Sequence, residues 1–312
     1  MPGQLKEVRN RIKSVDSIQQ ITKAMKMVSA AKLRRAQDAI QQMRPYAEKL
    51  QEMLQHIVSN SDGDVDMSLA EERPINNILI ILVTSDRGLC GSYNASLIKL
   101  AKHHILEKYP EQYAKGNITL LPIGKKGAEH FTRHTHFAGK KSGKGLNIKS
   151  DYSELLQELS FGQIQEASQY TRQEFINGEI DKVEIIYSKF VNAVLQEFKV
   201  EPFLPIPKNQ EEPELVKKEE NKSERNADFI FEPDQKSLVE ELMPKILNTQ
   251  LYKAILDANA SEHGARMTSM DNATDNADEL LKDLKITYNR ARQAAITTEL
   301  TEIVSGAAAL EG

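Results

Sequence analysis

The sequence is poor in several residues from which chains of this length usually build a core. Among 312 residues there is one cysteine and no tryptophan, and aromatic residues make up 6%. A single cysteine, Cys90, cannot form a disulfide within the chain, so a disulfide-stapled scaffold is excluded and a reducing compartment is natural. Aromatic side chains dominate ordinary globular cores. Their scarcity indicates either a lean α/β domain or a chain that spends much of its length in narrow helical contacts.

Long hydrophobic runs are also absent. The longest wholly apolar run, 78–83, has six residues, whereas a membrane-spanning helix needs about 20. The first residues contain no apolar signal segment, so we expect no export. With 15 glycines and 11 prolines, the chain also lacks the composition of a collagen-like protein.

Charge is unevenly distributed along the chain. The formal net charge is −4, yet residues 1–44 hold ten Lys/Arg and three Asp/Glu, a net of +7. Residues 262–312 hold five basic and nine acidic residues, a net of −4. Opposite charges suit two segments that lie side by side. A nucleic-acid-binding arm is the alternative for the basic end, but its apolar periodicity disfavours that function.

The N-terminal segment has the heptad spacing of a long coiled-coil helix. Pro45 interrupts it without changing the phase of the spacing, which predicts a kink rather than an end. The seam is expected to slip by three residues after Val15. Its predicted members are Leu5, Val8, Ile12 and Val15, then Ile18, Ile21, Met25 and Val28, and then Leu33, Ala36, Ile40, Met43, Ala47, Leu50, Leu54 and Ile57.

The C-terminal segment has a similar seam built from small residues. Beyond Leu284 its predicted members are all Ala, Thr or Ser, which allow close approach but bury little apolar surface. Four larger apolar residues lie off the seam and need a partner if they face outward: Ile296, Leu300, Ile303 and Val304. The predicted seam is Ala273, Ala277, Leu280, Leu284, Thr287, Ala291, Ala294, Thr298, Thr301, Ser305 and Ala308.

Helix length gives the strongest deduction. As single helices, residues 5–57 and 245–310 would span about 80 Å and about 99 Å. A compact chain of this length has a diameter of roughly 50 Å. The two ends must therefore project from any globular part, most economically as an antiparallel pair.

Between the ends, strand and helix patterns alternate, which predicts a mainly parallel, Rossmann-like sheet covered on both faces. A hairpin strand follows the last parallel strand. The expected strands are 78–84, 117–123, 182–190 and 194–203, and the expected helices are 97–105, a stretch after Gly124, and 153–177. Residues 208–227 differ because eleven of the twenty are charged. We expect an exposed, mobile insertion there, with strand pairing resuming near 229–231.

No constellation of residues predicts a self-contained active site. The turn after the first strand, TSDRGLCGSYN (84–94), is the most site-like segment, because Gly88 and Gly91 allow a tight turn whose N–H groups could hold an anion. A plain turn with a helix cap is the simpler interpretation. His130, His134 and His136 lack a further ligand at metal-binding spacing. The sequence therefore predicts no cofactor and no metal.

Three long segments nevertheless resemble the gamma subunit of rotary (F-type) ATP synthases. They are residues 11–36 with the run KAMKMVSAAKLRRA, the turn at 84–94, and the C-terminal stretches 260–277 and 290–309. The matches lie in order at both ends and in the middle of the chain. The resemblance implies an α/β fold with a long antiparallel coiled coil of the two terminal helices and a central Rossmann-like domain.

The resemblance also implies a function. In that family the coiled coil is the central-stalk rotor inside a ring of three alpha and three beta subunits, and the α/β domain lies near the epsilon subunit and the membrane c-ring. Proton-driven rotation would be coupled to ATP synthesis on the beta subunits, or ATP hydrolysis to proton pumping. The chain would have no active site and would lie peripherally on the cytoplasmic face of a bacterial inner membrane.

Family contact residues map onto individual positions. Met25 and Arg266 match positions that face an acidic loop of the beta subunit, and Gln293, Thr297 and Glu299 match contacts higher on the shaft. Lys26 departs from the family, because an acidic residue is expected there. The 208–227 insertion lacks a cysteine pair and is therefore not a chloroplast-type redox insert.

These observations divide the chain into an N-terminal coiled-coil helix (1–60), an α/β domain (75–207 and 228–234), the charged insertion (208–227) and a C-terminal coiled-coil helix (235–312). A second hypothesis stays open from the residues alone. It is a small α/β enzyme or anion-binding module with long oligomerisation helices.

Overall fold

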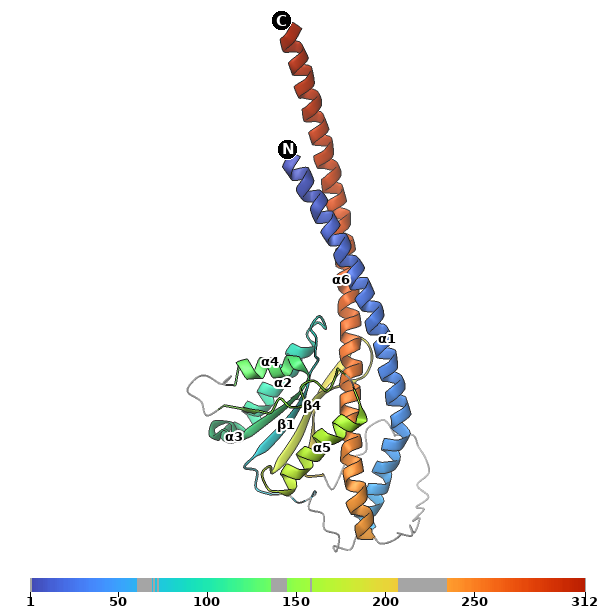
Figure 1. The fold of residues 1–312 in the computed structure, drawn as a ribbon, viewed down its shortest axis with the longest axis vertical. Helices are drawn as coiled ribbons and strands as arrows, with labels where there is room; N and C mark the ends of the chain where they lie inside the picture. The colour runs from blue at the N-terminus through green and yellow to red at the C-terminus, as the bar shows by residue number, and fades with distance from the viewer. Residues whose placement is uncertain are drawn as a thin grey trace.

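Two long helices form a shaft, and an α/β domain lies beside its lower half (Figure 1). This computed structural model describes residues 2–60, 69, 71, 73–135, 145–157, 159–206 and 235–311. Helix α1 spans Pro2–Asn60 with 59 residues, and α6 spans Gln235–Glu311 with 77 residues. At 1.5 Å per residue these helices are about 90 Å and about 115 Å long. Pro45 lies within α1 and Pro244 within α6, so neither proline ends its helix.

The seam of α1 keeps an unbroken heptad, and the predicted three-residue slip after Val15 is wrong. The predicted seam residues Ile18, Ile21 and Val28 are 53%, 58% and 57% exposed. The chain instead turns polar residues inward over this stretch, because α6 offers them hydrogen-bonding partners. Buried or partly buried positions recur at Leu5, Val8, Ile12, Val15, Gln19, Thr22, Lys26, Ser29, Leu33, Ala36 and Ile40.

The seam of α6 is displaced by one residue from part of its predicted course. Leu281 is buried at 6% exposure and packs with Val15 of α1, whereas Leu280, the predicted member, is 39% exposed. Tyr288 also lies inward and accepts a 2.9 Å hydrogen bond from the Arg9 guanidinium, so the upper seam is not built from small residues alone. The inward positions are Thr274, Ala277, Leu281, Leu284, Tyr288, Ala291, Ala295 and Thr298.

Cross-helix contacts fix the antiparallel register. Arg9 bonds to Tyr288, Gln19 bonds to Asp278 at 2.5 Å, and Lys26 bonds to Asp271. The two residue numbers in each pair sum to 297, which places Pro2 level with residue 295. From there α6 continues without α1 for about 16 residues, or about 24 Å, and Figure 1 shows the C-terminus projecting beyond the N-terminus.

The α/β domain contains a five-stranded sheet of order β3-β2-β1-β4-β5. Its strands pair in parallel except for β5, which is antiparallel to β4. The predicted fold class and the hairpin are thus confirmed. The elements are β1 Ile78–Val83, α2 Tyr93–Lys108, α3 Pro110–Lys115, β2 Ile118–Ile123, α4 Lys125–Arg133, β3 Asn147–Ile148, α5 Phe161–Ile176, β4 Lys182–Phe190 and β5 Gln196–Leu204.

One helix prediction was too long at its start. The pattern over 153–177 predicts a single helix, but residues 151–157 form turns and α5 begins only at Phe161. The Ser160 side chain accepts a hydrogen bond from the Gln163 N–H and caps α5 at its first turn. The expected insertion at 208–227 and the expected strand near 229–231 lie outside the described residues.

Both faces of the sheet are covered, and the shaft itself covers one of them. Leu79, Ile81 and Val83 of β1 pack with α5 and with α6 residues between Leu242 and Ala258. The alternate residues of β1 pack with α2, α3 and α4 on the other face. Helix α6 is therefore a core element of the domain as well as half of the shaft, so the domain and the shaft form one packed body.

Candidate functional site

The turn after β1 lies where open α/β sheets commonly bind ligands, outside the carboxyl ends of the strands at the point where strand order reverses. In this chain α6 occupies that position. Its side chains reach the end of β4 and the turn that follows it. The Ser261 hydroxyl donates to the Ser188 carbonyl at 3.1 Å, and the Thr268 hydroxyl donates to the Ala193 carbonyl at 3.0 Å. The shaft helix therefore packs against this end of the sheet.

The turn itself is held by a local hydrogen-bond network. The Ser85 N–H donates to Asn94 Oδ1 at 3.0 Å, and Asn94 Nδ2 donates to Ser85 Oγ at 2.7 Å. Left-handed backbone conformations occur at Leu89 (φ 63°) and Gly91 (φ 59°). Gly88 has no such φ, so only one of the two glycines expected to permit the turn adopts the conformation that favours glycine.

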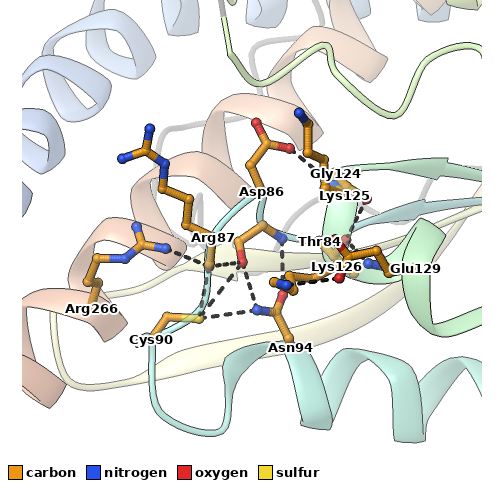
Figure 2. Close-up of polar contacts among 12 residues, drawn as sticks. Thr84, Asp86, Arg87, Cys90, Asn94, Gly124, Lys125, Lys126, Glu129 and Arg266 are labelled. Atoms are coloured by element: carbon orange, nitrogen blue, oxygen red, sulfur yellow. Dashed lines mark hydrogen bonds and ion pairs between the residues drawn. The ribbon is translucent and has the colours of Figure 1, made fainter.

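The same turn also caps α4, because its atoms accept hydrogen bonds from the first N–H groups of that helix. The Gly127 N–H donates to Thr84 Oγ1 at 2.9 Å, and the Lys125 N–H donates to Asp86 Oδ1 at 3.1 Å. The Lys126 N–H donates to the Ser85 carbonyl at 3.0 Å. Figure 2 shows these contacts converging on the turn. The N–H groups that begin α4 are therefore bonded to the turn and are not free to hold an anion.

Arg266 joins α6 to this turn. Its side chain is 8% exposed, and its Nη1 lies 2.6 Å from Oε1 of Glu262, which is 9% exposed. Nη2 and Nε donate to the carbonyls of Arg87 and Gly88 at 2.9 and 3.3 Å. In Figure 2 the Arg266 side chain points at the backbone of the turn, while the Arg87 side chain extends away from it.

The electrostatics of this region are those of a buried ion pair. Burial raises the pKa of Glu262, and the Arg266 guanidinium opposes that shift. Burial and the nearby Arg266 charge lower the pKa of His263 to about 4, so its imidazole is neutral at pH 7. A neutral ring can accept from Arg266 Nη1, which lies 3.3 Å from His263 Nδ1.

Met25 and Lys26, also singled out from the sequence, lie on the α1 side of the shaft. Lys26 forms an ion pair with Asp271 of α6, and both side chains are partly exposed, at 40% and 46%. Met25 is half-buried. It lies in line with the exposed residues Ile18, Ile21 and Val28, and the four form an apolar stripe on α1 beside the seam, which we call the outer stripe. Sequence reasoning missed this surface because it assigned these apolar residues to the seam.

Gln293, Thr297 and Glu299 are exposed on α6 near its unpaired end. The Thr297 hydroxyl donates to the Gln293 carbonyl of its own helix at 2.9 Å. Close to them, Ile296, Leu300, Ile303 and Val304 are 47%, 58%, 67% and 67% exposed. These four side chains thus face outward in this chain, which is the condition under which the sequence predicts that they need a partner.

Cys90, His130 and His134 pack against their neighbours, and His136 lies outside the described residues. Cys90 is buried, and Asn94 Nδ2 donates to its Sγ at 3.2 Å. His130 and His134 stack with ring centroids 4.7 Å apart. In the part of the chain that the structure describes, no group of three or more His, Cys, Asp or Glu is arranged to hold a metal ion.

Comparison with known proteins decides the family. The family model described as ATP synthase matches residues 4–310. An ATP synthase gamma chain from Cytophaga hutchinsonii is 51% identical over 310 residues, 99% of each chain. One from Chlorobium phaeobacteroides is 45% identical over 308 residues, again 99% of each. The chain belongs to the ATP synthase gamma chain family.

Solved structures agree on the fold. The chain resembles one from the Euglena gracilis mitochondrial ATP synthase with a TM-score of 0.62 and 18% identity, covering 99% of this chain and 95% of that one. It resembles one from the central stalk and c-ring structure of the Tetrahymena thermophila mitochondrial enzyme with a TM-score of 0.54 and 22% identity, covering 81% and 99%. Across the described residues, every helix is too short or too polar to cross a bilayer.

Proposed function

We propose that this chain is a rotor shaft that couples rotation of a membrane c-ring to ATP synthesis, and that it has no active site of its own. Membership of the gamma chain family makes it a central-stalk subunit of an ATP synthase. Three alpha and three beta subunits would surround the shaft, and epsilon and the c-ring would lie near the α/β domain. The chain would lie peripherally on the cytoplasmic face of a bacterial inner membrane.

The unpaired end of α6 carries this proposal. This part of α6 extends beyond α1. Its four exposed aliphatic side chains at 296–304 have no packing partner within the described chain. Clustered exposed apolar residues mark interaction surfaces. A ring of subunits with a narrow central bore would cover them, because the helix there is single and its neighbouring residues are small.

Coupling requires that torque reach the shaft from the domain. Helix α6 is shared between the sheet core and the shaft, with Leu247, Leu251 and Ile255 fully buried against the sheet. A turn of the domain would therefore turn the shaft as one body. An asymmetric shaft would bias each beta subunit among conformations of different nucleotide affinity, which is a coupling free energy between distant sites. In the reverse direction of rotation, ATP hydrolysis would drive proton pumping.

We assign the ring contacts to exposed positions on α6 and to partly buried positions on α1. Gln293, Thr297 and Glu299 would meet beta loops near the top of the shaft, and Met25 and Lys26 would meet beta lower down. Asp271 balances the positive charge at Lys26, so the departure from the acidic residue expected there leaves the local net charge near zero. Arg266, buried in this chain, would present at most its edge to a beta loop.

Co-purification tests the assembly. The tagged full chain, expressed with alpha and beta subunits, is expected to retain both, while isothermal titration of ATP into the chain alone is expected to show no binding at micromolar concentration. Micromolar ATP binding by the isolated chain would argue for the alternative enzyme or nucleotide-binding function. Failure to retain alpha and beta would contradict the rotor function.

Truncation tests the placement of the unpaired end. Removing residues 300–312 should weaken assembly or coupling, measured as ATP-driven proton pumping in inverted membrane vesicles, while the far-UV spectrum of the domain is preserved. The matched control replaces exposed Lys115 at the end of α3 with Met. Unchanged pumping by the truncated chain would contradict the placement.

A further inference from the structure

We infer that Arg266 is a positioning residue that fixes the turn at 85–91 to the shaft and so holds Leu89 outward. The inference rests on the proposed function only for its consequence in the assembled enzyme. Within the chain it rests on contacts between α6 and the end of β1. It differs from the expectation that Arg266 contacts a beta subunit, because each of its three nitrogens already has a partner inside the chain.

The planar Arg266 guanidinium donates hydrogen bonds to two successive backbone carbonyls of the turn. Nη2 reaches the Arg87 carbonyl and Nε reaches the Gly88 carbonyl, at 2.9 and 3.3 Å. Nη1 faces the Glu262 carboxylate at 2.6 Å. A guanidinium can satisfy three such acceptors from one rigid group, whereas an ammonium offers a single point charge. This arrangement requires arginine at position 266.

Glu262 holds Arg266 in this position through a buried ion pair. Both partners are less than a tenth exposed, and a buried charge is tolerated only when it is paired and hydrogen-bonded. The Glu262 carboxylate lies one helical turn before Arg266 on α6, so it holds the guanidinium against the turn from the same rigid helix. The position of the turn is therefore set by the shaft and not only by the sheet.

The turn held in this way exposes a leucine in a left-handed backbone conformation. Leu89 has a left-handed φ of 63° and is 62% exposed. A non-glycine residue in this conformation is costly unless its surroundings impose it, and the side chain gains little burial in return. Beside it, a Cβ built on Gly88 meets no atom within 4 Å. The exposed Leu89 side chain and the open space beside Gly88 indicate that this side of the turn is shaped for contact with another subunit.

The reactivity of the Cys90 thiol can report on the position of this turn. It is the only cysteine in the chain, it is 2% exposed, and it lies next to Leu89. If Arg266 positions the turn, Arg266→Met should raise the rate at which Cys90 in the isolated full chain reacts with a maleimide by about tenfold, as expected for losing charge-assisted hydrogen bonds. Arg266→Lys should give an intermediate rate.

Controls separate a local effect from general destabilisation. Lys115→Met removes an exposed charge far from the turn and should leave the rate unchanged, and Leu281→Ala should lower the melting temperature without a selective effect on Cys90. Because Arg266→Met leaves Glu262 buried without its partner, Glu262→Gln/Arg266→Met is measured as well. A Cys90 rate that is unchanged in both folded Arg266→Met variants would overturn the inference.

The assembled enzyme tests whether Arg266 acts through the turn. We expect Arg266→Met and Leu89→Ala each to lower the ratio of protons pumped to ATP hydrolysed, and the double variant to be no worse than the worse single one. Additive losses, together with an unchanged Cys90 rate, would show direct contact between Arg266 and the ring and would overturn the inference. Failure of the chain to assemble with alpha and beta subunits would instead contradict the proposed function, because the Cys90 measurement needs no partner.

Discussion

Lys26 of α1 and Asp271 of α6 form an ion pair across the shaft. On the same seam the Thr22 and Thr274 hydroxyls lie 2.8 Å apart, and Gln19 donates to Asp278 at 2.5 Å. With the buried Ser29, four successive seam positions of α1 are therefore polar, between an apolar cluster around Val15 and another around Leu33. Polar seam residues that pair with each other select one register at some cost in stability.

The ion pair predicts recovery on charge exchange. Lys26→Asp and Asp271→Lys each place like charges across the seam and should lower the free energy of unfolding by about 0.5–1 kcal/mol, the range for partly exposed pairs. The double exchange should recover most of this loss. Urea unfolding of the full chain at low salt measures the effect, and losses that simply add in the double variant would show that the two residues do not interact.

The corrected α6 seam predicts a contrast between adjacent leucines. Leu281→Ala should cost about 2 kcal/mol or more, because it removes a buried side chain from the cluster with Val15. Leu280→Ala, at 39% exposure, should cost much less. Thermal or urea unfolding of the two variants decides the phase of the helix, and the opposite ranking would restore the seam predicted from the sequence.

Asp257 predicts a loss of stability as the pH rises. Burial raises its pKa to about 6, against the opposing charges of Lys253, Lys189 and Arg44. The native state therefore holds a proton that the unfolded state releases between about pH 4 and pH 6, and stability falls over that window by up to about 3 kcal/mol. Relative to the parent chain, Asp257→Asn should gain stability as the pH rises from 4 to 6. A difference in unfolding free energy that does not change with pH would contradict the shift.

Glu184 predicts the opposite dependence. Burial alone would raise its pKa, but hydrogen bonds from His104, Lys108 and Tyr109 outweigh burial and lower the pKa to about 2. The stabilisation is present above about pH 4.5 and is lost as the pH falls toward 2, with a size of roughly 3 kcal/mol. Glu184→Gln should unfold at lower urea concentration than the parent at pH 7, and the gap should narrow in acid. Equal gaps at pH 7 and pH 3 would rule out the shift as its source.

Two glycines predict contrasting responses to alanine. Gly124 has φ +107°, and a Cβ there would lie 2.2 Å from the Thr84 carbonyl oxygen. Gly124→Ala should therefore cost more than about 2 kcal/mol. Gly88→Ala meets open space and should change stability by less than about 0.5 kcal/mol. Melting curves of the isolated chain compare the two, and a large loss for Gly88→Ala would mean that its glycine serves packing within the chain.

Strand and helix patterns were sufficient to predict most of the fold. The continuous apolar run at 78–83 predicts a strand covered on both faces, and the break at Asn192 predicts the β4–β5 hairpin. Helix lengths also follow from the sequence, because periodicity persists through Pro45. The first residue of a helix does not follow from the pattern in the same way. The predicted helix over 153–177 began too early, because a helical pattern does not reveal where a cap such as Ser160 begins the helix.

The outer stripe could not be predicted from the pattern. Ile18, Ile21 and Met25 have the spacing of a seam, and hydrophobicity alone favours burying them. They lie outside the seam because the heptads on either side fix the phase of α1 and because α6 supplies polar partners for Gln19, Thr22 and Lys26. Such partners lie about 250 residues away in the chain, so local sequence carries no sign of them.

The sequence by itself determined that two long helices must project from an α/β domain, because periodicity and length are local properties that no globule of this size can contain. Its motifs also determined the family. Only the tertiary structure decided which face of each helix is turned inward and that Arg266 is held against the turn after β1. Those features depend on contacts between residues far apart in the chain, and the physical reason is that a charged or polar side chain is buried only where distant partners satisfy it.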